Sequence, residues 1–293
     1  KELYFASSDA PLIGNATEVA YLDDNNYGYV SLDEIAVFKH GKKASITFNA
    51  LPKDKSYAQK EGYTFFMEKE IYEQGAVVSE TIMGRVKNHK VTLENLDDEY
   101  LKGIDDVVLC ACGTSYHAAL TASYLFERLA KVRTKVEVAS EFRYRKPYLN
   151  KNSLFIVISQ SGETADTLEA LRIAKEAGLR TLAICNVDNS SIVRLADNTL
   201  LTRAGIEKGV ASTKAFATQI IVLWMLVLQM ASAKGSISKK ELDHEIKTLL
   251  HIPQILNIDN SLQEKLHRLS KHYLHGHGFF FIGRDIFYLL ALE

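Results

Sequence analysis

From about residue 105 to residue 230, short apolar runs alternate with longer stretches in which apolar residues recur every three or four positions. The short runs are VVLCA (107–111), VEVA (136–139), LFIVI (154–158), TLAICN (181–186) and NTLLT (198–202). Each run has the length of a strand, and the stretches between them have the period of helices. Strands that alternate with helices predict a five-stranded parallel sheet flanked by helices on both faces, a Rossmann-like α/β fold.

The chain before this region has a different pattern. Residues 1–50 contain strand-like pieces (EVAYL, IAVF, ASITF) separated by turns, which predicts antiparallel strands. Residues 51–60, LPKDKSYAQK, predict a linker because they are polar and contain a proline. From residue 61 the segments FFMEKEIYEQ, VSETIMGRV and LENLDDEYLKGI predict three short amphipathic helices.

The end of the chain repeats an earlier pattern. Two helical runs follow residue 238, and GFFFIG (278–283) then predicts a new strand. The segment FFFIGRDIFYLLALE has the same order of features as VLCACGTSYHAALTA, namely an apolar strand, a glycine, small or polar residues and a helix. We therefore expect residues 61–275 to form one α/β unit, residues 276–293 to begin a second, and the chain to be a fragment of a longer protein.

Composition narrows the class of protein. The chain has 293 residues, of which 47% are hydrophobic and 24% charged, and its formal net charge of −1 offers no electrostatic attraction for nucleic acid or an anionic membrane. The apolar run IIVLWMLVL (220–228) is well short of the roughly 20 residues of a membrane span and predicts a buried helix. The N-terminus lacks the profile of a secretory signal, and three cysteines are too few for a disulfide framework, so we expect a cytoplasmic protein.

Small and hydroxyl-bearing residues follow three of the predicted strands. They are CGTS (112–115), SQSGET (159–164) and EKGVAST (207–213), each placed where a helix begins. Backbone N–H groups and hydroxyls at a helix start favour an anion, and the carboxyl ends of parallel strands lie at one edge of the sheet. Several hydroxyl donors without an obligatory Lys or Arg predict a monophosphate site. The loops are not nucleotide loops, because neither GxxxxGK[ST] nor GxGxxG is present. For any one loop, simple helix capping is an equally good explanation.

The same segments resemble a known family. CGTS (112–115), SQSGETADT (159–167) and GVASTKAF (209–216) resemble the sugar-isomerase (SIS) fold family. Together with ASEFRYRK, LAICNV and MEKEIYEQ, they are similar to one group within it, the isomerising glutamine–fructose-6-phosphate aminotransferases, or glucosamine-6-phosphate synthases. The matching motifs run from about residue 65 to 216. By position and strand pattern, residues 1–50 would correspond to the C-terminal part of a class II glutaminase domain.

The resemblance implies a reaction and a set of binding residues. The family converts fructose 6-phosphate and glutamine to glucosamine 6-phosphate and glutamate, the first step of hexosamine and UDP-N-acetylglucosamine synthesis, without a metal or organic cofactor. The implied substrate-binding residues are Ser115, Ser159, Gln160, Ser161, Thr164, Val210 (through its backbone) and Ser212. The implied supporting loop residues are Cys112, Gly113, Thr114 and Gly162.

The catalytic residues of the family have no match in this chain. The nucleophilic cysteine opens the mature glutaminase domain, whereas this chain starts with Lys1, and the isomerase base, ring-opening histidine and C-terminal lysine would come after Glu293. We therefore expect a substrate-binding half-site that is inactive alone, with glutamine used only by the missing glutaminase part. The family also implies a homodimer.

Other reactive residues have simpler explanations. Cys110 and Cys112 predict buried or loop thiols rather than a metal pair, and His267, His272, His275 and His277 fit no zinc spacing. Glu141 and Arg143 predict surface ion pairing. Two alternative functions remain open, a non-catalytic SIS regulator that senses sugar phosphates and a stand-alone phosphosugar isomerase or deglycase. The β-rich N-terminal region and the linker favour the aminotransferase over both.

Overall fold

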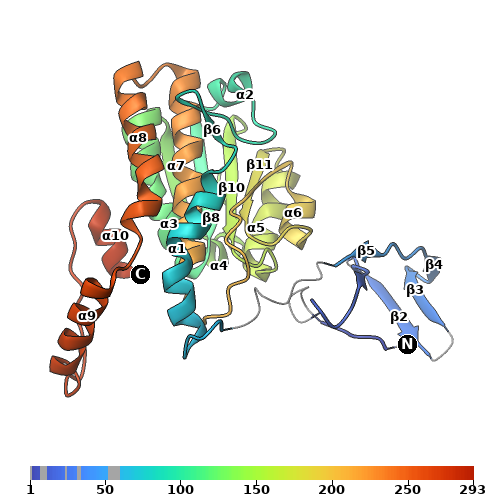
Figure 1. The fold of residues 1–293 in the computed structure, drawn as a ribbon. Coiled ribbons are helices and arrows are strands. Elements are labelled where there is room, and N and C mark those ends of the chain that lie inside the picture. Colours follow the sequence, from blue (N-terminus) through green and yellow to red (C-terminus); the bar gives the residue numbers. More distant parts are fainter. Residues whose placement is uncertain (1, 7–11, 24, 32–33, 52–59) are drawn as a thin grey trace. The chain divides into compact units, whose positions relative to one another are not determined.

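The computed structural model describes residues 2–6, 12–23, 25–31, 34–51 and 60–293 (Figure 1). The chain divides into two compact units, residues 1–62 and 63–293, which are described separately. Most of the predicted linker at 51–60 lies outside the described residues.

The first unit contains short antiparallel strands. The strands are β1 (Glu18–Val19), β2 (Asn26–Val30), β3 (Ile35–Lys39), β4 (Lys42–Ala44) and β5 (Asn49–Ala50). Strands β2, β3 and β4 form a three-stranded sheet, and β1 pairs with β5. The antiparallel pairing agrees with the sequence prediction, but β2 was not predicted. The predicted strand ASITF (44–48) is wrong, because only Ala44 of this segment belongs to a strand.

The second unit contains a parallel sheet in the order β12-β11-β10-β8-β9. Its strands are β8 (Asp106–Ala111), β9 (Arg133–Val138), β10 (Ser153–Ser159), β11 (Arg180–Cys185) and β12 (Asn198–Leu201). Every residue of β8 and β10 is buried, because helices cover both faces. The predicted five-stranded α/β fold is therefore confirmed.

Helices form a layer on each face of this sheet (Figure 1). One layer contains α4 (Ala139–Phe142), α5 (Ala165–Glu176) and α6 (Ser191–Leu195). The other contains α1 (Phe66–Ile82), α2 (Asp98–Lys102), α3 (Gly113–Leu125) with its π-helical extension η2 (Phe126–Ala130), α7 (Lys214–Lys234) and α8 (Lys239–Ile255). The remaining elements are the hairpin β6 (Val86–Lys87) and β7 (Lys90–Val91), and the helices α9 (Asn260–His272) and α10 (Ile286–Leu292).

Helix α7 is the central helix of its layer. Among the described residues it is the one helix long and apolar enough to cross a membrane, yet 72% of its most apolar window is buried inside the protein. Helix α7 carries apolar residues on all sides because it packs against α1, α2, α3 and α8 as well as against the sheet. The buried helix predicted from the run at 220–228 is confirmed.

In the second unit, the structure corrects two predictions of secondary structure. The segments 65–74 and 78–86 were predicted as separate helices, but α1 runs through Gly75 to Ile82. A Cβ at Gly75 would lie 2.8 Å from the Pro253 carbonyl oxygen, so glycine allows α8 to pack closely on α1. Residues 278–283 form no strand. In the described part of the chain no strand pairs with them, and Phe280 and Ile282 are more than 90% exposed.

Candidate functional site

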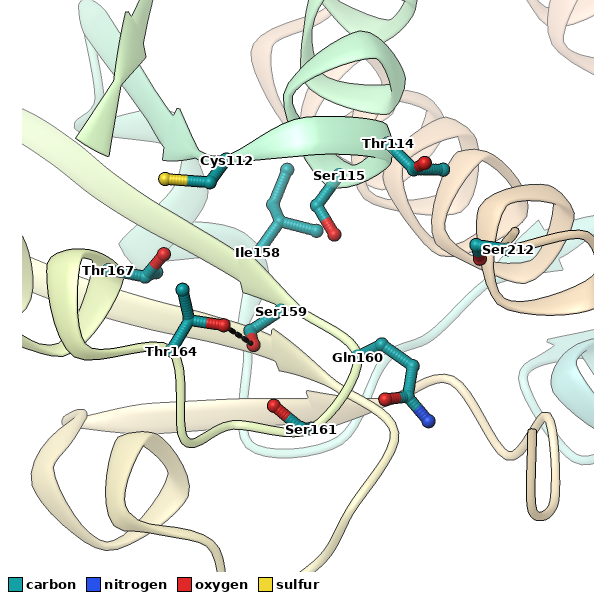
Figure 2. Close-up of a pocket in the computed structure, with 10 residues that line it drawn as sticks. All are labelled: Cys112, Thr114, Ser115, Ile158, Ser159, Gln160, Ser161, Thr164, Thr167 and Ser212. Atoms are coloured by element: carbon teal, nitrogen blue, oxygen red, sulfur yellow. Dashed lines mark hydrogen bonds between the residues drawn. The ribbon is translucent and has the colours of Figure 1, made fainter. Parts of the chain in front are cut away.

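The three predicted loops meet at the carboxyl edge of the parallel sheet. The β8–α3, β10–α5 and β12–α7 connections enclose a pocket of about 220 Å³ (Figure 2). Its lining residues are Cys112, Thr114, Ser115, Ile158, Ser159, Gln160, Ser161, Thr164, Thr167 and Ser212. None of these ten side chains is charged, and most of them carry a hydroxyl or amide group.

Most of the residues singled out from the sequence line this pocket, and three do not. Gly113 and Gly162 have positive φ angles of 55° and 69°, so they shape the loops through their backbone. The Val210 side chain points to solvent and is fully exposed. Ile158 and Thr167 were missed. Thr167 follows Thr164 by three residues, a spacing that places both on one face of a helix and would have signalled it.

Two helices begin at the pocket without a capping side chain. Helix α3 starts after Cys112 and α5 starts after Thr164, and neither residue caps its helix through the side chain. The first N–H groups of a helix have no acceptor within it. Together with the positive end of the helix dipole, these groups make the pocket favourable for an anion.

The serines of the β10–α5 loop accept hydrogen bonds from the loop backbone and line the pocket. The backbone N–H of Gly162 donates to the Ser159 hydroxyl oxygen at 3.0 Å, and the N–H of Glu163 donates to that of Ser161 at 3.2 Å. The Ser159 and Thr164 hydroxyl oxygens are 3.3 Å apart (Figure 2). Because the Ser161 oxygen accepts from the backbone, its own hydrogen remains able to donate to a ligand. Of Ser159 and Thr164, one hydroxyl donates to the other, and the second keeps its hydrogen for a ligand.

A residue distant in sequence orients Ser115. The side-chain amide of Gln219, in α7, donates to the Ser115 hydroxyl oxygen at 3.0 Å. Gln219 is 1% exposed, and its carbonyl oxygen is buried without a hydrogen-bond partner, as is the hydroxyl of Thr167. By accepting from Gln219, Ser115 keeps its hydrogen for the pocket. Nearby, the Thr114 hydroxyl donates to the Glu293 carboxylate at 2.5 Å.

Two carboxylates hold the β12–α7 loop, residues 207–213, in place. Glu207 accepts from the backbone N–H of Thr213 and the hydroxyl of Ser212, both at 3.0 Å. Glu70, a buried residue of α1, accepts from the backbone N–H of Gly209 at 3.1 Å. A Cβ at Gly209 would lie 2.4 Å from a Glu70 carboxylate oxygen, so this position needs glycine for the carboxylate to approach.

Arg143, Cys110 and Cys185 have structural surroundings. Arg143 pairs with Asp166 in the first turn of α5 at 2.6 Å, so the predicted surface ion pair forms with Asp166 rather than with Glu141. Burial raises the pKa of the Cys110 and Cys185 thiols, which disfavours their reactive thiolate forms. No three His, Cys, Asp or Glu residues are grouped to hold a metal ion in the described ranges.

Comparisons with known proteins identify the domain that contains these loops. Residues 100–229 match the SIS domain. The chain is 61% identical over its full length to the glutamine–fructose-6-phosphate aminotransferase (isomerizing) of Campylobacter jejuni and 45% identical, over 99% of its length, to that of Helicobacter pylori. In both cases it spans 48% of the relative, about half its length.

A solved structure gives the same result. The C-terminal domain of glucosamine-fructose-6-phosphate aminotransferase from Francisella tularensis is 40% identical and superimposes with a TM-score of 0.76, covering 80% of this chain and 66% of that one. The pocket loops at 112–115, 159–164 and 207–213 all lie within the SIS match. This chain therefore contains a SIS domain and is, over its whole length, a homologue of the isomerising glutamine–fructose-6-phosphate aminotransferases.

Proposed function

We propose that the pocket binds fructose 6-phosphate and glucosamine 6-phosphate, as the sugar-phosphate half-site of a glutamine–fructose-6-phosphate aminotransferase. The observation that carries this proposal is the convergence of hydroxyl donors on the uncapped starts of α3 and α5. Such a site suits a phosphate, whose oxygens accept several hydrogen bonds, each contributing about 1.5–3 kcal/mol when the acceptor is charged. The names of the relatives supply the sugar.

Each part of the pocket has a role in this proposal. Ser159, Gln160, Ser161 and Thr164 hold the phosphate with the first amides of α5, and Ser115 donates from the start of α3. Ser212 and the backbone of Val210 contact the sugar. Cys112, Gly113, Thr114 and Gly162 support the loops. None of the ten lining side chains is a carboxylate, histidine or lysine, so the pocket lining supplies no evident base for moving a proton between C1 and C2.

The domain assignment belongs to the same proposal. Residues 1–50 would be the end of a glutaminase domain, residues 61–275 the first SIS unit and residues 276–293 the start of a second. Glutamine would act only in the glutaminase part, and the active protein would be a cytoplasmic homodimer. We expect the isolated chain to form no glucosamine 6-phosphate from fructose 6-phosphate and glutamine, and product above background would contradict this.

Calorimetric titration of the chain with fructose 6-phosphate tests the binding proposal. Titration with fructose shows whether binding requires the phosphate group, and titration with inorganic phosphate shows how much the sugar contributes to binding. We expect binding that requires the phosphate and weakens about tenfold in Ser161→Ala, because one charge-assisted hydrogen bond is lost. A variant that binds as tightly as the wild type, or equal binding of fructose, would contradict the assigned phosphate site.

A further inference from the structure

Glu207 lies in the loop between β12 and α7, and its side chain caps α7. One carboxylate oxygen accepts from the backbone N–H of Thr213 at 3.0 Å and of Ala215 at 3.2 Å. Thr213, the residue before the helix, makes no capping hydrogen bond through its own side chain. A negatively charged group at this end of a helix is favourable, so the carboxylate takes the place of a conventional cap.

This cap makes α7 different from the two other helices that begin at the pocket. The N–H groups at the starts of α3 and α5 have no capping side chain and can bind an anion. At α7 a carboxylate already occupies that position. A phosphate beside Ser212 would meet the negative charge of Glu207, so phosphate is favoured at the α3 and α5 side of the pocket and the uncharged part of a ligand at the α7 side.

Glu207 also determines how Ser212 can bind a ligand. The second carboxylate oxygen of Glu207 lies 3.0 Å from the Ser212 hydroxyl. An ionised carboxylate only accepts hydrogen bonds, so the Ser212 hydrogen points to Glu207 and the lone pairs of the Ser212 oxygen remain available. Ser212 can then accept from a sugar hydroxyl, but it has no hydrogen left to donate to a phosphate.

The loop that carries Glu207 is itself anchored. Glu70 accepts from the backbone N–H of Gly209, and buried Lys214, at the start of α7, pairs with Glu73 of α1 at 2.7 Å. The loop is therefore bound to α1 on both sides of Ser212. These contacts hold Glu207 beside Ser212, which lines the pocket.

We infer that Glu207 is a positioning residue that orients a bound sugar phosphate, by making Ser212 an acceptor for a sugar hydroxyl and by keeping the phosphate away from α7. This inference rests on the proposed function. It concerns a side chain that does not line the pocket and acts on the ligand through Ser212 and through its charge.

A double-mutant cycle of Glu207→Gln and Ser212→Ala tests this inference. In Glu207→Gln the amide oxygen can still accept from Thr213 and Ala215, but the amide N–H donates to Ser212 and turns the hydroxyl into a donor. We expect each single variant to bind fructose 6-phosphate about 3- to 10-fold more weakly. The double variant should be within about twofold of the weaker single variant, because both changes remove one interaction.

Inorganic phosphate is the matched probe, since it has no sugar hydroxyl. Its affinity should be unchanged in Ser212→Ala and unchanged or tighter in Glu207→Gln. Thermal unfolding followed by the fluorescence of Trp224 shows whether each variant is folded. If Glu207→Gln does not fold, Glu207→Asp replaces it. Aspartate withdraws the carboxylate from Ser212 but keeps the charge, so fructose 6-phosphate should bind more weakly while the affinity for inorganic phosphate stays unchanged.

The outcomes distinguish this inference from the proposed function. The role of Glu207 would be overturned if the losses of fructose 6-phosphate affinity in the two single variants multiplied in the double variant. It would also be overturned if Glu207→Gln lost inorganic phosphate and fructose 6-phosphate binding equally. Neither result would contradict the proposed function. Absence of fructose 6-phosphate binding by the wild-type chain would overturn the proposed function, and the inference with it.

Discussion

Replacing Gly162 by alanine tests how the β10–α5 loop, residues 159–164, is built. Gly162 has a φ of 69°, and a Cβ there would lie 2.0 Å from the Ser190 hydroxyl oxygen and 2.8 Å from the Cys185 sulfur. The backbone of the loop is bound at the same place, because the N–H of Ile192 donates to the Gly162 carbonyl oxygen at 3.1 Å. The added methyl group would force the loop away from the start of α6.

The magnitude follows from two costs. A left-handed conformation costs an alanine about 1–2 kcal/mol, and an extra methyl group in a closely packed place costs about 1–3 kcal/mol. We expect Gly162→Ala to lower the free energy of unfolding by about 2–5 kcal/mol. Because the clash displaces residues 159–164, binding of fructose 6-phosphate should weaken as well.

Gly178→Ala is the matched control. Gly178 has a similar φ of 76°, but a Cβ there would have nothing within 4 Å. It should cost only the conformational part, about 1–2 kcal/mol, and leave ligand binding unchanged. Urea unfolding followed by Trp224, the one tryptophan of the chain, measures both variants in the unit that contains the pocket. If Gly162→Ala cost no more than Gly178→Ala, the close packing of this loop would be refuted.

Two other predictions follow from the contacts of the pocket and of the sheet. Gly209→Ala should displace the Glu70 carboxylate and weaken fructose 6-phosphate binding about tenfold, while inorganic phosphate binds as before. If calorimetry showed that both ligands bind equally more weakly, the role of Gly209 would not be confined to the loop at 207–213. For Asp197, burial raises the carboxyl pKa, but hydrogen bonds from Lys175 and Thr181 outweigh this effect and the pKa is lowered. Asp197 therefore stabilises the fold above the unfolded-state pKa of about 4 and loses this effect as pH falls through its lower folded value. Asp197→Asn should reduce stability at pH 7 but have a diminishing effect below about pH 4, and a loss independent of pH in denaturation at a series of pH values would contradict this.

The sequence was sufficient to predict the sheet and most of the pocket. The strands β8 to β12 were predicted because each is a short apolar run followed by a helical period, a pattern that depends only on local spacing. The pocket loops were predicted because they combine small and hydroxyl-bearing residues at the carboxyl ends of these strands. That these loops bind a sugar phosphate stays a prediction.

The predictions failed where an element depends on a neighbour. The apolar segment 278–283 has the composition of a strand, but a strand needs a second strand for its backbone hydrogen bonds, and the described part of the chain provides none there. Helix α1 continues through Gly75, a position at which α8 packs so closely that a Cβ would lie 2.8 Å from the Pro253 carbonyl oxygen. Neither result follows from local periodicity.

Only the tertiary structure determined which hydroxyls of the pocket donate hydrogen bonds and which accept them. Gln219 donates to Ser115 across 104 residues of sequence, and Glu70 holds a loop 139 residues away. Sequence spacing predicts which side chains share a helix face or a sheet edge, because those distances are set by the geometry of one element. Which hydroxyl must donate and which must accept depends on partners that only the packed helices bring within hydrogen-bond distance.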